Sequence, residues 1–463
     1  MKALLKEILI SWKNTEGNVH STDELLEWIE DLNRTTYIEI KECSINDSSF
    51  WFYDDYNGEV LNRKRSFFSI KGMRLFEDDC FVREQPIIIQ PEIGYLGIIC
   101  KKINGVLNFL MQAKIEPGNV NCVQISPTIQ ATKSNFTRAH GGKLPLYFEY
   151  FENSSKYKVI YDQIQSEQAS RFLKKRNRNM IMEVNDDIPV YDNFKWMTLG
   201  QIKKLMEIDN LVNMDTRTVL SGIPFSSVNF SDEALKELEE YFSDSALFNS
   251  FFKTQPAETL PIIYQYVNNY KMFRDIKQVS VPLNQLVDWR IDEFGITCDK
   301  PADFLVRYYD INISGREVQA WTQPLFKAIG QATFGLIYCK SGGITKFLIS
   351  ARGEIGAFDK IELGPSVQQE PTHDHSCDNV IDKIFCKHLS EKKGIILDVK
   401  LSEEGGRFFH EQNRNIIMEI SPNELPSIPD GYFWADYNTL NYLIQINNCL
   451  NIQLRNLLSL IMI

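Results

Sequence analysis

The chain has 463 residues with 61 acidic and 50 basic side chains, a formal charge of −11, and 43% apolar residues. Its length exceeds what one hydrophobic core usually supports, so we expect two domains, and an acidic chain without a basic stripe excludes a nucleic-acid-binding protein. No run of about 18 apolar residues predicts a membrane span, and nine scattered cysteines without a CxxC pair are typical of reduced thiols in a cytoplasmic protein.

The first half of the chain predicts a helix followed by a strand-rich core. Ser21–Arg34 begins with a Ser/Thr cap and acids and has apolar residues at helical spacing, which indicates a helix. The runs that indicate strands are Tyr37–Cys43, Phe67–Ile70, Ile87–Ile89, Gly94–Lys101 and Val106–Ala113. Asn104–Gly105 predicts the turn of a hairpin between the last two runs.

The rest of this half predicts further strands and two helices. Val120–Thr132 is expected to be extended, and Met180–Val184 to form a strand. Ser166–Arg176 and Leu199–Asn210 are predicted to be helical. A β-rich core covered by helices predicts an α/β (α+β) fold with mixed sheets.

The second half of the chain repeats the first at a constant step of 238 residues. The recurring pairs in one polar segment are Ala113/Ala351, Glu116/Glu354, Gly118/Gly356, Pro127/Pro365 and Gln130/Gln368. The step slips to 236 where Arg176–Glu183 is echoed by Gln412–Glu419, and Glu403–Gln412 is expected to be a helix like Ser166–Arg176. A unit this long indicates a duplicated domain, since solenoid repeats span about 20–50 residues. We therefore expect domains at 1–225 and 240–463.

Polar side chains crowd the segment Gln112–His140 of the first copy. The members that we select as candidate substrate contacts are Asn119, Gln124, Gln130, Thr132, Ser134, Asn135 and Arg138. Polar residues at this density beside Pro and Gly turns do not build a core, because each would need a partner if buried. A solvated loop is the alternative, but recurrence of the segment favours a binding site.

A few side chains could carry out proton transfer. Glu116 and Glu354 can each act as a general base or hold a sugar hydroxyl, and turn capping is the alternative. His140 is the other candidate in the first copy, because its reference pKa lies near neutrality; an ordinary surface histidine is the alternative. His373 begins an H-x-H pair that could ligate a metal, but no third ligand is assigned, so we predict no metal site.

Two arginines and two tryptophans also recur between the copies. Arg178 and Arg414 lie in matched NRN triplets, and an arginine fork fits a diphosphate; an internal Arg–Glu pair is the alternative. Trp196 and Trp434 could stack on a nucleobase or belong to the core. The sequence has no GxGxxG after a strand, no Walker loop and no GxSxG, so we expect chemistry that uses side chains alone.

The long segment Gln90–Gly142 resembles the signature of the NDP-hexose 2,3-dehydratases, and IELGPSVQ (Ile361–Gln368) resembles its second-half counterpart. The resemblance implies a duplicated protein with two tandem Nudix-like α/β/α halves, which forms a homodimer. Nudix hydrolases hold magnesium with an RExxEExG helix, of which only Glu167–Gln168 and Glu403–Gly405 remain here. A metal-dependent hydrolase is therefore disfavoured.

The implied reaction is loss of water across C2 and C3 of a nucleotide-linked 4-keto-6-deoxyhexose. The expected substrate is dTDP-4-keto-6-deoxyglucose, although the sequence leaves GDP or another nucleotide open. The product is a 3,4-diketo-2,6-dideoxy sugar for a downstream ketoreductase, and no cofactor is required. A non-catalytic nucleotide-sugar-binding protein is the alternative.

The resemblance also suggests roles for particular residues. In the first copy Glu116 or His140 would be the base, Lys114 and Asn135 would contact the enolate or a hydroxyl, and Arg178 would bind the diphosphate. The second copy has Ile355 where Pro117 stands in the first, which predicts a more diverged pocket. It still offers a candidate set: Glu354, Arg352, Gln368, His373 and Arg414.

Overall fold

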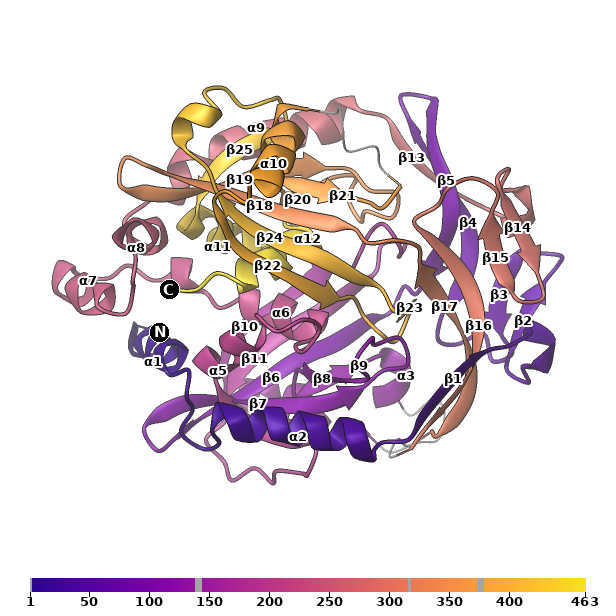
Figure 1. Cartoon of the computed structure of the whole chain (residues 1–463), viewed down its shortest axis with the longest axis horizontal. Helices are drawn as coiled ribbons and strands as arrows, with labels where there is room; N and C mark the ends of the chain where they lie inside the picture. Colours follow the sequence, from indigo (N-terminus) through magenta and orange to yellow (C-terminus); the bar gives the residue numbers. More distant parts are fainter. Residues whose placement is uncertain (1, 138–143, 315–317, 373–378) are drawn as a thin grey trace.

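The computed structural model describes residues 2–137, 144–314, 318–372 and 379–463, and its strands form four sheets (Figure 1). The chain contains both helices and strands, and both central sheets are mixed. The α/β class predicted from the sequence is confirmed. The Nudix-like character of each half and the domain limits at 1–225 and 240–463 stay predictions.

The first half builds a seven-stranded sheet around one parallel pair. Its strands are β6 (Ile93–Ile103), β7 (Val106–Ile115), β8 (Val123–Ser126), β9 (Ile129–Ala131), β10 (Lys158–Ser166), β11 (Arg176–Glu183) and β12 (Phe194–Thr198). The order is β10-β11-β6-β7-β12, with β8 also on β7 and β9 also on β6, and only β11 and β6 run parallel. Asn104 and Gly105 have φ of 49° and 84°, which confirms the predicted hairpin turn between β6 and β7.

The second half builds a seven-stranded sheet with the same pairing. Its strands are β18 (Thr333–Ser341), β19 (Ile344–Arg352), β20 (Glu362–Pro365), β21 (Val367–Gln369), β22 (Ile395–Ser402), β24 (Gln412–Glu419) and β25 (Tyr432–Asp436). Each strand has the partner that the repeat predicts, and the parallel pair is again the equivalent one, β18 with β24. The internal repeat seen in the sequence therefore extends to sheet topology.

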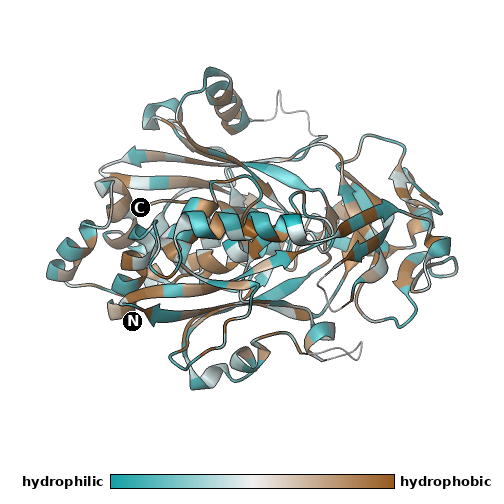
Figure 2. Cartoon of the chain, turned by 60° about the horizontal axis from the view of Figure 1, so that its bottom comes forward, coloured by the Kyte–Doolittle hydropathy of each residue, from teal (hydrophilic) through white to brown (hydrophobic). Residues whose placement is uncertain are grey.

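Helices join the two central sheets into one body. The main ones are α1 (Lys2–Lys13), α5 (Leu199–Leu205), α6 (Met214–Ser221), α8 (Ser245–Phe252), α11 (Tyr437–Ile444) and α12 (Ile452–Ser459). α6 packs on α12, and one apolar core includes Leu96 and Val219 of the first half with Phe334 and Leu457 of the second. In Figure 2 apolar helical segments lie between two layers of strands. The halves thus share a core.

Two smaller sheets exchange a strand between the halves. The first contains β2 (Trp51–Asp54), β3 (Glu59–Asn62), β4 (Ser69–Glu77) and β5 (Cys80–Ile89). The second contains β14 (Trp289–Asp292), β15 (Gly295–Cys298), β16 (Phe304–Ile313), β17 (Ala320–Ala328) and β23 (Phe408–Phe409). β1 (Ile38–Glu42) of the first half pairs with β16, and its repeat equivalent β13 (Ile276–Val281) pairs with β4 (Figure 1). Each half therefore supplies the edge strand of the other.

The helix predicted at Ser21–Arg34 is confirmed as α2 (Thr22–Thr35). Ser21 caps it, with Glu24 completing a capping box. The remaining helices are α3 (Lys133–Phe136), α4 (Phe148–Glu152), α7 (Asp232–Glu239), α9 (Leu260–Phe273) and α10 (Val380–Glu391). No helix in the described part of the chain is long and apolar enough to cross a membrane.

The helices predicted at Ser166–Arg176 and Glu403–Gln412 are wrong. Beyond the ends of neighbouring strands these segments form turns without a helix, which we name turn 167–175 and turn 403–411; the second contains the short strand β23. Their backbone binds the other half: Gly356 N–H donates to the Ala169 carbonyl at 2.8 Å, and Gly118 N–H donates to the Gly405 carbonyl at 2.7 Å. These tertiary hydrogen bonds outweigh the weak local preference for a helix.

Glycine is required where each turn meets the opposite half. A Cβ on Gly118 would lie 1.6 Å from the Phe408 carbonyl oxygen, and one on Gly356 would lie 1.9 Å from the Phe172 carbonyl oxygen. No side chain fits at such a distance. The recurrence of these glycines in the sequence therefore reflects close packing of each turn against the other copy.

Candidate active site

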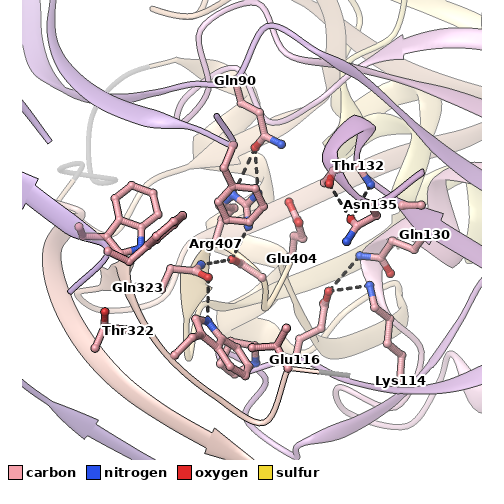
Figure 3. A pocket seen from close by; sticks show the side chains of 18 of the residues that line it. Gln90, Lys114, Glu116, Gln130, Thr132, Asn135, Thr322, Gln323, Glu404 and Arg407 are labelled. Carbon is pink, nitrogen blue, oxygen red and sulfur yellow. Dashed lines mark hydrogen bonds and ion pairs between the residues drawn. The ribbon is translucent and has the colours of Figure 1, made fainter. Parts of the chain in front are cut away.

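A cavity of about 670 Å³ lies between the two halves. This volume falls in the range of about 300–1,000 Å³ that is usual for small-molecule sites. The first half contributes Lys114, Glu116, Gln130, Thr132 and Asn135, and the second half contributes Trp321, Thr322, Gln323, Glu404, Gly406 and Arg407. The site is therefore composite, and turn 403–411 closes it from the side of the second half (Figure 3).

Glu116 lies just past the end of β7, where its carboxylate is buried against the cavity wall. Its Oε1 atom accepts hydrogen bonds from Lys114 Nζ at 2.9 Å and from Gln130 Nε2 at 3.0 Å. Both donors favour the ionised carboxylate, because they bind its negative charge. Glu116 is thus held as an oriented base at the end of a rigid strand.

Glu404 points into the same space from turn 403–411 (Figure 3). A Cβ built on Gly406 would lie 3.0 Å from Glu404 Oε1 and 3.5 Å from Glu116 Oε1, so the two carboxylates face each other across this glycine. Burial raises the pKa of Glu404, and the nearby charge of Glu116 raises it further, while Arg407 acts in the opposite direction. Among the described residues, none donates a hydrogen bond to the Glu404 carboxylate.

Arg407 fixes the turn that carries Glu404. Its Nε and Nη2 atoms donate to Gln90 Oε1 at 3.2 and 3.1 Å, and its Nη1 atom donates to the Gly406 carbonyl at 2.7 Å. The guanidinium lies over the rings of Phe67 and Phe68, 4.6 and 4.4 Å from their centroids. Residues of the first half therefore position an acid that belongs to the second.

Further ionisable groups lie along or behind the cavity wall. Asp215, at the start of α6, lines the cavity, and burial raises its pKa well above the ordinary value. Burial also raises the pKa of Glu167 to about 8, helped by the charge of Glu404. Lys175 lines the cavity and donates to the Glu92 carbonyl at 2.6 Å. This wall can hold protons near neutral pH.

The equivalent position in the second half is tightly packed. Ile355, which replaces Pro117, is 1% exposed and packs against Met73, Leu75 and Ile87. Arg171, the equivalent of Arg407, forms ion pairs with Glu370 and Glu411 at 3.4 and 3.6 Å. Glu354 remains bonded to Gln368 at 2.7 Å, as Glu116 is to Gln130, and burial raises its pKa.

Three further substitutions change the acids of the cavity and the space beside them. At the step of 236 residues, Glu404 corresponds to Gln168 and Gly406 corresponds to Ser170. At the step of 238 residues, Asp215 corresponds to Gln453. The equivalent position in the second half therefore keeps the Glu–Gln pair. It has amides in place of Glu404 and Asp215, and a serine side chain in place of Gly406.

The structure brings together part of the predicted site. Lys114, Glu116, Gln130, Thr132 and Asn135 line the cavity. Asn119 is buried and donates to the Cys122 carbonyl at 3.0 Å, and Gln124 is buried and donates to Ser402 of the second half at 2.6 Å. Ser134 belongs to α3. Arg138, His140 and His373 lie outside the described residues.

The recurrent arginines lie away from the cavity lining. Arg178 forms two hydrogen bonds to Asp162, at 2.7 and 2.6 Å, and Arg414 pairs in the same way with Asp398. Arg352 donates to Ser350 Oγ at 2.9 Å. The recurrent tryptophans pack against cores of the two central sheets, Trp196 in the first half and Trp434 in the second.

Sequence reasoning missed the residues that the second half contributes. These are Glu404, Arg407, Trp321, Thr322 and Gln323, together with Asp215 and Lys175 of the first half. A signal was present, because Gln85 and Gln323 recur at the common step and Glu403–Gly405 stood out as an acidic remnant. Nothing in the sequence indicated that these segments face the pocket of the other copy.

Comparison with known proteins gives consistent matches over both halves. The model of a family described as NDP-hexose 2,3-dehydratase matches residues 22–223 and 261–461. A dTDP-4-dehydro-6-deoxy-alpha-D-glucopyranose 2,3-dehydratase of Amycolatopsis orientalis is 34% identical, over 98% of this chain and 93% of that protein. Proteins of the same name from Saccharopolyspora spinosa and Streptomyces violaceoruber are 34% and 33% identical; they cover 95% and 93% of this chain, and 90% and 95% of their own lengths.

Proposed function

The chain belongs to the NDP-hexose 2,3-dehydratase family, and from this premise we propose that the cavity between its halves dehydrates a dTDP-linked 4-keto-6-deoxyhexose across C2 and C3. The predicted family and hydro-lyase activity are confirmed by the family match and by three relatives named as dTDP-4-dehydro-6-deoxy-glucopyranose 2,3-dehydratases. A nucleotide-sugar substrate follows from the same relatives. The assignment of the reaction to this cavity and to particular side chains is our proposal.

The chemistry starts at the carbon next to the ketone. The C4 carbonyl acidifies the C3 hydrogen, and Glu116, held by Lys114 and Gln130, removes it. A positioned general base contributes roughly 10²–10⁴-fold. Asn135 and Lys114 supply donors for the developing enolate, and a preorganised donor of this kind contributes about 3–4 kcal/mol in well-studied cases. The C2 hydroxyl then leaves, and the enol becomes a 3,4-diketo-2,6-dideoxy sugar.

The observation that carries this proposal is the contrast between two equivalent glutamates. Glu116 borders a cavity large enough for a small molecule, whereas Glu354 lies beside the buried Ile355 and the ion-paired Arg171. The same carboxylate–amide pair is thus kept twice, but only the first copy lines this cavity. The reaction therefore belongs to the pocket of the first half.

Aromatic side chains of the cavity suit the nucleotide end of the substrate. Phe50, Phe67 and Trp321 line the same space as the two glutamates. A thymine ring can stack on such side chains, and Lys175 and Arg407 bring positive charge to the wall for the diphosphate. These side chains support a substrate whose base and diphosphate lie in the cavity with the sugar.

Three further parts of the proposal rest on the family resemblance and the chemistry of the product. We propose a homodimer, a cytoplasmic location, and consumption of the reactive diketone by a ketoreductase. The eight cysteines in the described part of the chain are free thiols, which supports a reducing compartment.

The proposal is tested by measuring the mass of the reaction product. The protein is incubated with dTDP- and GDP-linked 4-keto-6-deoxyhexoses, the product is trapped with a reductant, and an 18-dalton loss is sought by mass spectrometry. Water loss with the dTDP sugar is expected. Binding without water loss would instead favour a nucleotide-sugar-binding protein.

The duplication supplies a matched pair of variants. Glu116→Gln should lower kcat by at least about 10²-fold because it removes the base. Glu354→Gln makes the same change at the equivalent position, outside this cavity, and should stay near the wild-type rate. Full activity of Glu116→Gln, or loss of activity only in Glu354→Gln, would contradict the assignment.

A further inference from the structure

We infer that Glu404 is the catalytic acid that protonates the departing C2 hydroxyl, opposite Glu116 as the base, so that each half of the chain supplies one of the two proton-transferring groups. This inference rests on the proposed function and deepens it. It concerns a residue of the second half that enters the pocket only because turn 403–411 crosses to the first.

The geometry suits elimination across adjacent carbons. The hydrogen leaves C3 and the hydroxyl leaves C2, and each must be within about 2.6–3.2 Å of its carboxyl group. Two carboxyls that serve neighbouring carbons must therefore face one small space. Glu116 and Glu404 do so, because each has an oxygen within 3.5 Å of one point, the Cβ position of Gly406.

The surroundings of the two carboxyls assign their roles. Glu116 receives hydrogen bonds from an ammonium group and an amide, which suits an ionised base. Glu404 is buried beside that negative charge. Burial is the largest effect and raises its pKa, Arg407 lowers it, and the charge of Glu116 raises it. A raised pKa favours the protonated form of this carboxyl, which is the form that can donate a proton.

Two other groups could supply the proton to the hydroxyl. Lys114 donates one N–H to Glu116 at 2.9 Å, and in the proposed function its remaining donors serve the developing enolate. Asp215 lines the cavity from α6, but the atoms nearest to the Cβ position of Gly406 belong to Glu404 and Glu116 and not to Asp215. Glu404 is therefore the donor that lies opposite the base.

The pseudo-symmetric half supports the same assignment. Its glutamate and amide, Glu354 and Gln368, are retained, yet Gln168 stands in place of Glu404 and Ser170 in place of Gly406. The two substitutions remove a proton donor and the open space beside it. Among the described residues, the acid is thus present at the position that lines the cavity, and an amide stands at its equivalent.

The proposed step balances without an outside reagent. The C3–H bond breaks, its proton goes to Glu116, and its electron pair forms the enolate with the C4 carbonyl. The C2–O bond then breaks as Glu404 gives its proton to the oxygen, and water leaves while the C2–C3 double bond forms. One proton must afterwards pass from Glu116 to Glu404, which the facing arrangement allows.

A leaving group that needs no proton tests the role directly. Fluoride departs without protonation, so the 2-deoxy-2-fluoro analogue of the dTDP-linked 4-keto sugar should bypass Glu404 but still require Glu116. We expect Glu404→Gln to lose about 10²-fold or more on the hydroxyl substrate and less than about fivefold on the fluoro analogue, measured as fluoride release. Glu116→Gln should be slow on both substrates.

Hydrogen exchange at C3 supplies a second readout. In D₂O, Glu404→Gln should still introduce deuterium at C3 of the recovered hydroxyl substrate, because its base is intact, whereas Glu116→Gln should not. Glu404→Asp keeps a proton to donate, so it should recover part of the lost rate and is the variant to use if Glu404→Gln does not fold.

The outcomes separate the two proposals. If the wild-type protein removes no water from the hydroxyl substrate, the proposed function fails. If the wild-type protein is active and Glu404→Gln matches it on the hydroxyl substrate, or stays equally slow on the fluoro analogue, the role of Glu404 is overturned. An Asp215→Asn variant that alone shows fluoride rescue would also overturn it.

Discussion

A methyl group on Gly406 should block the space in which the two carboxyls meet the sugar. The Cβ of Gly406→Ala would lie 3.0 Å from Glu404 Oε1 and 3.5 Å from Glu116 Oε1. Ordinary contact needs about 3.4 Å or more, so the Glu404 carboxyl must move by a few tenths of an ångström and the methyl group fills the rest. Misplacement by about 1 Å can cost roughly 10²-fold in rate, equal to about 2.7 kcal/mol in the barrier.

The backbone of Gly406 should accept alanine. The φ of Gly406 is not positive, and the atom nearest to its Cβ position is the end of the flexible Glu404 side chain. A Gly→Ala change at such a position usually stabilises by about 0.4–1 kcal/mol. We therefore expect an unchanged or slightly raised melting temperature together with a fall of about 10²-fold in kcat/KM, followed as loss of 18 daltons from the dTDP sugar.

Ser170→Ala provides the control at the equivalent residue of the other half. Its hydroxyl is buried and has no hydrogen-bond partner among the described residues, so removing it should leave both stability and kcat/KM within about twofold. Full activity of Gly406→Ala would refute the reasoning, because the substrate would then not occupy the space between Glu116 and Glu404.

Three other predictions follow from contacts between the halves. Arg407→Lys removes the two guanidinium hydrogen bonds to Gln90, which should cost about 1.5–3 kcal/mol of stability and lower kcat/KM about tenfold. An unchanged melting temperature in calorimetry would contradict this. Burial raises the pKa of Glu362 to about 8 from 4.5, so the folded protein binds an extra proton between these values and loses stability as pH rises. Glu362→Gln should flatten the decline in melting temperature from pH 5 to pH 8, and a slope equal to that of the wild type would oppose this account. Residues 1–239 or 240–463 expressed alone should aggregate, because each part lacks an edge strand that the other part supplies. Co-expression of the two parts should restore dehydration, and a part that folds by itself would argue against this account.

Local features could be predicted from the sequence where local chemistry determines them. Ser21 and Glu24 form the capping box that the cap sequence indicated, and Asn104 and Gly105 adopt the positive φ angles of a hairpin turn. Glu116 was found because its segment recurs and combines charge with turn residues. In each case the residues that allow the prediction lie within a few positions of the feature that they predict.

Features that depend on the other half could not be predicted in this way. Turn 403–411 has a helix-like sequence, but its backbone is bound by Gly118, which lies far away in the chain. Arg178 was expected to pair with Glu183 or a diphosphate, yet strand pairing of β10 with β11 places Asp162 beside it instead. No sequence motif around Glu404 indicates a catalytic acid, because its proposed role depends on the contact of turn 403–411 with the first half.

The reciprocal placement of β1 and β13 has a consequence for the origin of this protein. A single-copy ancestor with the same exchange would have needed two chains to complete its sheets, as in a domain-swapped dimer with two identical pockets. Fusion of two such copies would make the partners one molecule and free each copy to vary independently. One pocket could then close around Ile355 and Ser170 while the other retained an open, acid-lined interior.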